Sequence, residues 1–109
     1  MVILFGLKLY AEGVLVVGMS EINGKKPYEN SGIEEGDRII KVNKEEISCT
    51  AELIECVNRS DGAEVEICYV RDGKERETNI SPVKTSGNEY KLGLWVRDGV
   101  ARNWNYDIL

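Results

Sequence analysis

The stretch Gly32-Ile33-Glu34-Glu35-Gly36-Asp37-Arg38-Ile39-Ile40-Lys41-Val42-Asn43 decides the fold of this chain. The preceding residues 28–31 have the pattern of a short helical turn, which the glycine at position 32 would end. Gly36-Asp37 predicts a tight turn, because glycine accepts a positive φ and aspartate forms hydrogen bonds with the nearby backbone. Residues 38–42 then have the pattern of a buried strand. We therefore expect a helical turn, a tight turn and a strand in direct succession.

Size and composition indicate one soluble globular domain. The chain has 109 residues, of which 42% are hydrophobic and 30% are charged, and these values fit a single core. The 14 basic and 19 acidic side chains give a formal charge of −5, which argues against nucleic acid as a partner. No apolar run approaches the ~20 residues of a membrane-spanning helix. The N-terminus lacks the basic region of a signal peptide, so we expect a soluble chain without a targeting signal.

The reactive side chains exclude most enzyme and metal chemistry. The absence of histidine removes Ser-His and Cys-His catalytic pairs and the commonest metal ligand. The cysteines Cys49, Cys56 and Cys68 cannot all pair within one chain and lack zinc-binding spacing. We interpret them as small apolar side chains. We expect no metal ion, no cofactor and no catalytic residue.

Hydrophobic patterns indicate the other strands and one longer helix. Alternation or continuous apolar runs predict strands over residues 7–10, 14–19, 63–71, 75–80 and 90–97. Asp72-Gly73 predicts a two-residue hairpin turn. Ser48 or Thr50 predicts a capped helix that continues to residue 57 or 58, with apolar side chains on one face.

This order of elements predicts a mainly β chain with two helices, an α+β class. It suits a small, partly open barrel capped by a short and a longer helix. A groove between one strand and the longer helix is then the expected ligand site. Residues 1–99 would form this domain, and residues 100–109 a C-terminal tail.

The stretch 32–43 resembles the signature of PDZ domains, in which a G-Φ-x-x-G-D-x-Φ-Φ-x-Φ-N run follows the first short helix. In that family the run is scaffold and the ligand binds elsewhere. The resemblance implies a PDZ-like fold that binds a peptide or protein C-terminus as an added strand. Backbone amides would hold the terminal carboxylate, and an apolar pocket would hold the last side chain.

The same resemblance assigns the binding residues. Phe5-Gly6-Leu7 is similar to part of the family's carboxylate-binding loop, and Thr50 matches the position that meets the third-from-last ligand residue. Ile54 and Val57 fit a pocket and a plain core face equally well, because any amphipathic helix has this spacing. The resemblance implies a groove formed by Leu7, Leu9, Thr50, Ile54 and Val57.

A finer resemblance connects the chain with one group of bacterial enzymes. Residues 13–18, 32–43, 82–84 and 90–98 together are similar to the PDZ segment of the stage IV sporulation protein B family, serine peptidases of endospore-forming bacteria. Leu92 to Asp98 is the most specific part, and in that family it opens the peptidase domain. The resemblance implies a membrane-associated parent enzyme that acts between the two membranes of a developing spore. The family's catalytic regions are absent from this chain.

The leading hypothesis is a non-catalytic peptide-binding module that regulates or targets proteolysis. The alternative is a purely structural domain that packs against the peptidase domain and binds no peptide. An enzyme is a third hypothesis, which the missing histidine and the lack of a paired-carboxylate motif disfavour.

The tail ends in Tyr106-Asp107-Ile108-Leu109, which a PDZ-like groove would accept. Docking of this tail would bring the Leu109 carboxylate to the Phe5-Gly6-Leu7 amides, with Tyr106 toward Thr50, in the same chain or a neighbouring one. A neighbour's groove is the simpler geometry for a short tail, and reciprocal docking would give a dimer. The alternative is a disordered extension, as many chain ends are.

Overall fold

The computed structural model describes residues 13–98 and the backbone of residues 107 and 108. The predictions made for Phe5, Gly6, Leu7, Leu9, Tyr106 and Leu109 lie outside these residues. The described elements are β1 (Val14–Met19), β2 (Arg38–Val42), β3 (Glu45–Glu46), α2 (Thr50–Arg59), β4 (Val65–Arg71), β5 (Lys74–Ile80), β6 (Val83–Lys84), β7 (Tyr90–Lys91), β8 (Leu94–Asp98) and β9 (Asp107–Ile108).

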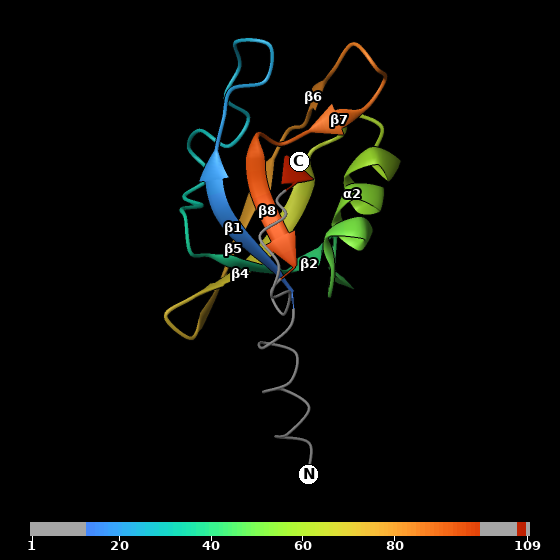
Figure 1. Ribbon diagram of the computed structural model, residues 1–109. Coiled ribbons are helices and arrows are strands. Elements are labelled where there is room, and N and C mark those ends of the chain that lie inside the picture. Colours follow the sequence, from blue (N-terminus) through green and yellow to red (C-terminus); the bar gives the residue numbers. More distant parts are fainter. Residues whose placement is uncertain (1–12, 99–106, 109) are drawn as a thin grey trace.

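Most of the strands form one antiparallel sheet (Figure 1). They pair in the order β5-β4-β2-β1-β8-β9, β3 adds to β2, and β6 and β7 form a separate hairpin. The two ends of this order, β5 and β9, do not pair with each other, so the sheet is open. The prediction of a mainly β fold is confirmed.

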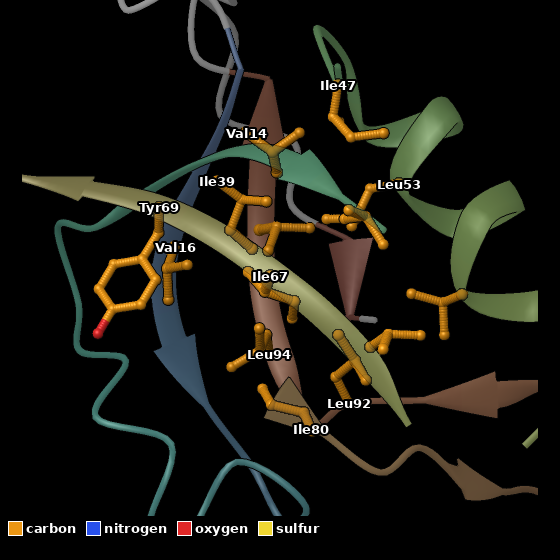
Figure 2. Close-up of a cluster of buried hydrophobic side chains, with 14 of the residues drawn as sticks. Val14, Val16, Ile39, Ile47, Leu53, Ile67, Tyr69, Ile80, Leu92 and Leu94 are labelled. Atoms are coloured by element: carbon orange, nitrogen blue, oxygen red, sulfur yellow. The ribbon is translucent and has the colours of Figure 1, made fainter. Parts of the chain in front are cut away.

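The core lies where α2 meets the inner face of the sheet (Figure 2). Alternate residues of β4 point into it, as the sequence pattern predicts, and Leu53 and Val57 of α2 are fully buried. Each large apolar side chain buried in this way stabilises the fold by roughly 1.5–3 kcal/mol. The central members of the cluster are Val14, Val16, Ile39, Val42, Leu53, Ile67, Leu92, Leu94 and Val96.

The prediction of a short helix over residues 28–31 is wrong. The chain forms two consecutive turns there, closed by hydrogen bonds from the Glu29 N–H to the Lys26 carbonyl and from the Ser31 N–H to the Tyr28 carbonyl. Asn30 has a φ of +70°, which a right-handed helix cannot contain. Within the described residues, α2 is therefore the only helix, and it is too short and too polar to span a membrane.

The predicted tight turn is confirmed, and a partly buried ion pair holds it. Gly36 has a φ of +94°, and the Asp37 side chain is almost fully buried. Arg71 of β4 donates hydrogen bonds from Nε and Nη2 to the two Asp37 carboxylate oxygens, at 2.8 and 2.7 Å. The Glu34 N–H donates to the same carboxylate at 2.7 Å. The hydrogen bonds to Asp37 raise the pKa of the Arg71 guanidinium above its ordinary value, so Arg71 stays charged.

The predicted last strand, residues 90–97, is broken in two by Gly93. This glycine has a φ of +81°, and a Cβ there would lie 2.6 Å from the Ser20 carbonyl oxygen. The Ser20 N–H also donates to the Gly93 carbonyl at 2.8 Å. The close approach redirects the chain, so that β8 begins beside β1.

Candidate peptide groove between β8 and α2

β8 and α2 form the two sides of the candidate groove. One edge of β8 pairs with β1, from Val14 opposite Asp98 to Met19 opposite Leu94. The other edge faces α2, and Figure 1 shows the short arrow of β9 between them, next to the C label. Leu94 and Val96 are buried in the cluster that also contains the buried face of α2. β8 and α2 thus lie over the same apolar cluster, with β9 on the edge of β8 that does not pair with β1.

An interaction between Asp98 and the helix start fixes one end of the groove. The Thr50 N–H donates to the Asp98 carboxylate at 2.6 Å, and a negative charge at this position also interacts favourably with the helix dipole. The predicted cap by the Ser48 or Thr50 side chain is wrong: the N-cap is Cys49, which makes no side-chain cap bond. The cap instead comes from a strand that is distant in the sequence.

Tyr90 and its partners fix the other end. The Tyr90 N–H donates to the Asn58 side-chain oxygen at 2.9 Å, and the Tyr90 hydroxyl donates to the Asp61 carboxylate at 3.3 Å. Burial and the neighbouring Asp61 raise the pKa of the Tyr90 hydroxyl. The segment that leads into β8 is therefore attached to the last turn of α2.

The helix residues predicted to line the groove occupy three different environments. Val57 is fully buried in the core, together with Leu53. Ile54 is half-buried and packs against the edge of that core. Thr50 is 6% exposed, at the end of α2 that Asp98 caps. Of these three residues, Val57 and Thr50 are buried and only Ile54 keeps a partly exposed side chain.

The Thr50 hydroxyl is a buried polar group without a partner. Its Oγ1 makes no hydrogen bond in the described structure, although a buried group of this kind costs about 1–3 kcal/mol when it is left unpaired. A ligand group that reached this oxygen would remove the penalty. The sequence indicates Thr50 only as a family position, and its burial becomes visible only in the structure.

The outer edge of β8 carries an antiparallel strand, β9. Trp95 pairs with Ile108, and Val96 pairs with Asp107. Strand addition to β8 is therefore compatible with the position of α2. Sequence reasoning did not assign β8 to the groove, although Leu92-Gly93-Leu94 repeats the apolar-Gly-apolar pattern of Phe5-Gly6-Leu7.

The described residues contain no cluster of side chains that could hold a metal ion. Burial raises the pKa values of the Cys56 and Cys68 thiols, so both stay protonated at neutral pH, and a thiol in this form is a poor nucleophile.

A separate depression of about 320 Å³ lies on the outer face of β2, β4 and β5, and it is lined by Lys41, Lys44, Glu66, Cys68, Glu75 and Glu77. Its mixed charges suggest no particular ligand.

Comparisons with known proteins identify protease relatives. The zinc metalloprotease RasP of Shouchella clausii (strain KSM-K16) is 39% identical over 98 residues, which cover 87% of this chain and 23% of that protein. A putative zinc metalloprotease of Staphylococcus aureus (strain MRSA252) is 26% identical over 102 residues, or 86% of this chain and 24% of that protein. The chain thus spans about a quarter of the length of these relatives. These relatives do not support the serine peptidase parent expected from Leu92 to Asp98.

Solved structures and a family model agree on the domain type. The PDZ domain of an SdrC-like protein from Listeria monocytogenes has the same fold, with a TM-score of 0.63 at 18% identity over 78% of this chain and 87% of that one. The protein GtR34C from Geobacillus thermodenitrificans gives a TM-score of 0.60 at 27% identity over 76% of this chain and 94% of that one. The model of the PDZ domain family matches residues 2–81. The chain belongs to the PDZ domain family.

Proposed function

We propose that this chain is the non-catalytic peptide-binding module of a protease, and that the peptide adds as an antiparallel strand to the α2-facing edge of β8. The observation that carries the proposal is the pairing of β9 with β8 at that edge. Backbone hydrogen bonds to an exposed strand edge supply affinity, and pockets for alternate side chains supply specificity. PDZ domains in general bind the C-termini of peptides, so a free C-terminus is the expected ligand.

We assign the carboxylate-binding loop to Leu92-Gly93-Leu94. Three features support this choice: the loop leads directly into β8, Gly93 has a positive φ, and Tyr90 fixes the segment to the end of α2. A glycine here lets the backbone turn its amides toward an anion without steric cost. Phe5-Gly6-Leu7 stays a prediction, since it lies within the match to the family model but outside the described residues.

Thr50 and Ile54 supply the helix wall of the proposed groove. Antiparallel addition carries the ligand backward along β8, from its terminus near Gly93 toward Asp98 and Thr50. The unpaired Thr50 hydroxyl therefore favours a ligand with a hydrogen-bonding side chain two residues before its terminus. The half-buried Ile54 offers an apolar contact to the same strand.

The parent enzyme is proposed only as a protease. The names of the relatives favour a zinc metalloprotease, whereas the likeness of Leu92 to Asp98 favours a sporulation serine peptidase acting between two membranes. Reading the genomic DNA on both sides of this coding segment separates them. An H-E-x-x-H zinc motif would support the metalloprotease, and a following serine peptidase domain would support the second parent.

Titration with matched peptides tests the binding function. The ¹⁵N-labelled chain would be mixed with octapeptides that end in a free aliphatic residue, and with the same peptides amidated. We expect amide shifts at residues 92–96 and in α2 with the free acids, and weaker ones with the amides. Shifts centred on residues 5–7 would instead assign the carboxylate-binding loop to that segment. The absence of any shift at millimolar peptide, in this chain and in a chain whose β9 pairing is prevented, would favour the purely structural domain.

A further inference from the structure

We propose that the segment containing Asp107 and Ile108 is a built-in competitor for this groove, which an incoming peptide must displace. The proposal rests on the proposed function, because it assigns the same β8 edge to ligand binding. It adds a regulatory state in which the chain covers its own site.

The position of β9 supports this inference. Asp107 and Ile108 pair with Val96 and Trp95, the central residues of the exposed β8 edge. This edge lies between the Gly93 turn and the Asp98 contact with α2. β9 runs antiparallel to β8, as the proposed ligand does. A peptide and β9 therefore require the same backbone N–H and C=O groups and cannot be bound together.

The short connection makes the competition effective. Only residues 99–106 separate the end of β8 from the start of β9. A linker of this length gives its attached strand an effective concentration in the millimolar range. A peptide that is present at micromolar concentration competes poorly with such a strand unless it binds much more tightly.

The pairing is also weak enough to be reversed. β9 contains only two residues, so few backbone hydrogen bonds can hold it to β8, and each contributes only about 0.5–1.5 kcal/mol. With β9 in place, the Thr50 hydroxyl still lacks a hydrogen-bond partner in the described structure. A longer ligand that supplied this bond would gain energy that the internal strand does not.

A proline variant of the full chain tests the competition. Asp107→Pro with Ile108→Pro removes both backbone N–H groups of β9 and so prevents ladder pairing. The matched control, Asp107→Asn with Ile108→Val, changes the same side chains and keeps both amides. The probe is a synthetic, fluorescein-labelled peptide of residues 102–109, and its dissociation constant is measured by anisotropy. We expect the proline variant to bind this peptide about 10-fold or more tightly than the parent and control chains.

A reversible cross-link provides a second test that does not depend on proline. Trp95→Cys with Ile108→Cys joins two directly opposed positions, with Cys49, Cys56 and Cys68 replaced by serine or alanine. We expect the oxidised chain to lose binding of the 102–109 peptide and the reduced chain to regain it. Binding that is unchanged by oxidation would overturn the proposal.

The outcomes separate the two proposals. Equal affinity in the parent chain and the proline variant would overturn the internal competition and leave the peptide-binding function standing. If the proline variant selects members of a random octapeptide pool with free C-termini but not the 102–109 peptide, the competition is likewise rejected. If neither probe binds the proline variant, both proposals fail.

Discussion

The two edges of the sheet differ in how their unpaired backbone groups are protected from pairing with other chains. β5 exposes charged side chains at Lys74, Glu75, Arg76 and Glu77, whereas β8 has no charged residue before Arg97 and carries β9. An unprotected strand edge is a template for pairing with other chains, and charge is a common protection. The β5 edge thus discourages any added strand, and the β8 edge accepts one. This difference supports the proposal that β8 is the ligand-binding edge.

Two glycines provide the largest expected contrast between the edges. Gly93 and Gly73 both have positive φ, but a Cβ at Gly93 would meet backbone at 2.6 Å, while one at Gly73 would have open space. We expect Gly93→Ala to destabilise the fold by about 2–4 kcal/mol through strain and overlap. Gly73→Ala should lose only about 1 kcal/mol. Urea unfolding of both variants measures the loss in free energy of unfolding. Equal losses in the two variants would contradict the close approach at Gly93.

The next effect concerns the contact between β8 and the helix. Asp98→Ala removes the acceptor for the Thr50 N–H, and loss of a helix cap typically destabilises by about 0.5–2 kcal/mol. Arg76→Ala, on the opposite edge, should change stability by less than about 0.5 kcal/mol. Asp98→Asn keeps a hydrogen-bond acceptor and should therefore destabilise the fold less than Asp98→Ala does. If thermal unfolding showed no loss of stability in Asp98→Ala, the contact between Asp98 and the start of α2 would not hold this end of the candidate groove.

Removing charge from β5 should make the two edges more alike. Glu75 and Glu77 are exposed on this strand, and replacing both with valine removes half of its exposed charges, leaving Lys74 and Arg76, and so weakens the charge protection of this edge. We expect stability to change by less than about 0.5 kcal/mol, while the apparent mass in light scattering rises with concentration. A monodisperse double variant at high concentration would show that these charges do not protect the edge.

The smallest expected effect lies beside the groove, at Glu52. The Ser48 N–H and hydroxyl donate to its carboxylate at 2.8 and 2.9 Å, and these bonds lower the pKa of Glu52. Because the folded pKa is lowered, the stabilisation is present above the unfolded carboxyl pKa and is lost as the pH falls through the folded value. The stability difference between the parent chain and Glu52→Gln should therefore shrink in acid. A difference that grows in acid would contradict this assignment.

Local features of the fold were predictable from the sequence. The Gly36-Asp37 turn, the Asp72-Gly73 hairpin and the alternation in β4 each depend on residues that are close in the chain. The same holds for the amphipathic helix, whose buried face follows from its spacing.

The groove was less predictable, because its geometry depends on distant contacts. Gly93 interrupts a strand pattern through contact with Ser20, and α2 is capped by a residue 48 positions away. β9 contains only two residues, too few to show a period. The resemblance to PDZ domains correctly indicated the family, and its assignment of Thr50, Ile54 and Val57 to the groove stays a prediction. It gave no means of choosing between the two apolar-Gly-apolar segments as the loop.

One measurement tests the central claim most directly. The ¹⁵N-labelled Asp107→Pro/Ile108→Pro chain is titrated with the 102–109 peptide, and amide shifts are compared between β8 and β5. We predict saturable shifts at Leu94–Asp98 and along α2, with none at Lys74–Ile80. Shifts at β5, or none at β8 at millimolar peptide, would contradict the assignment of β8 as the ligand-binding edge.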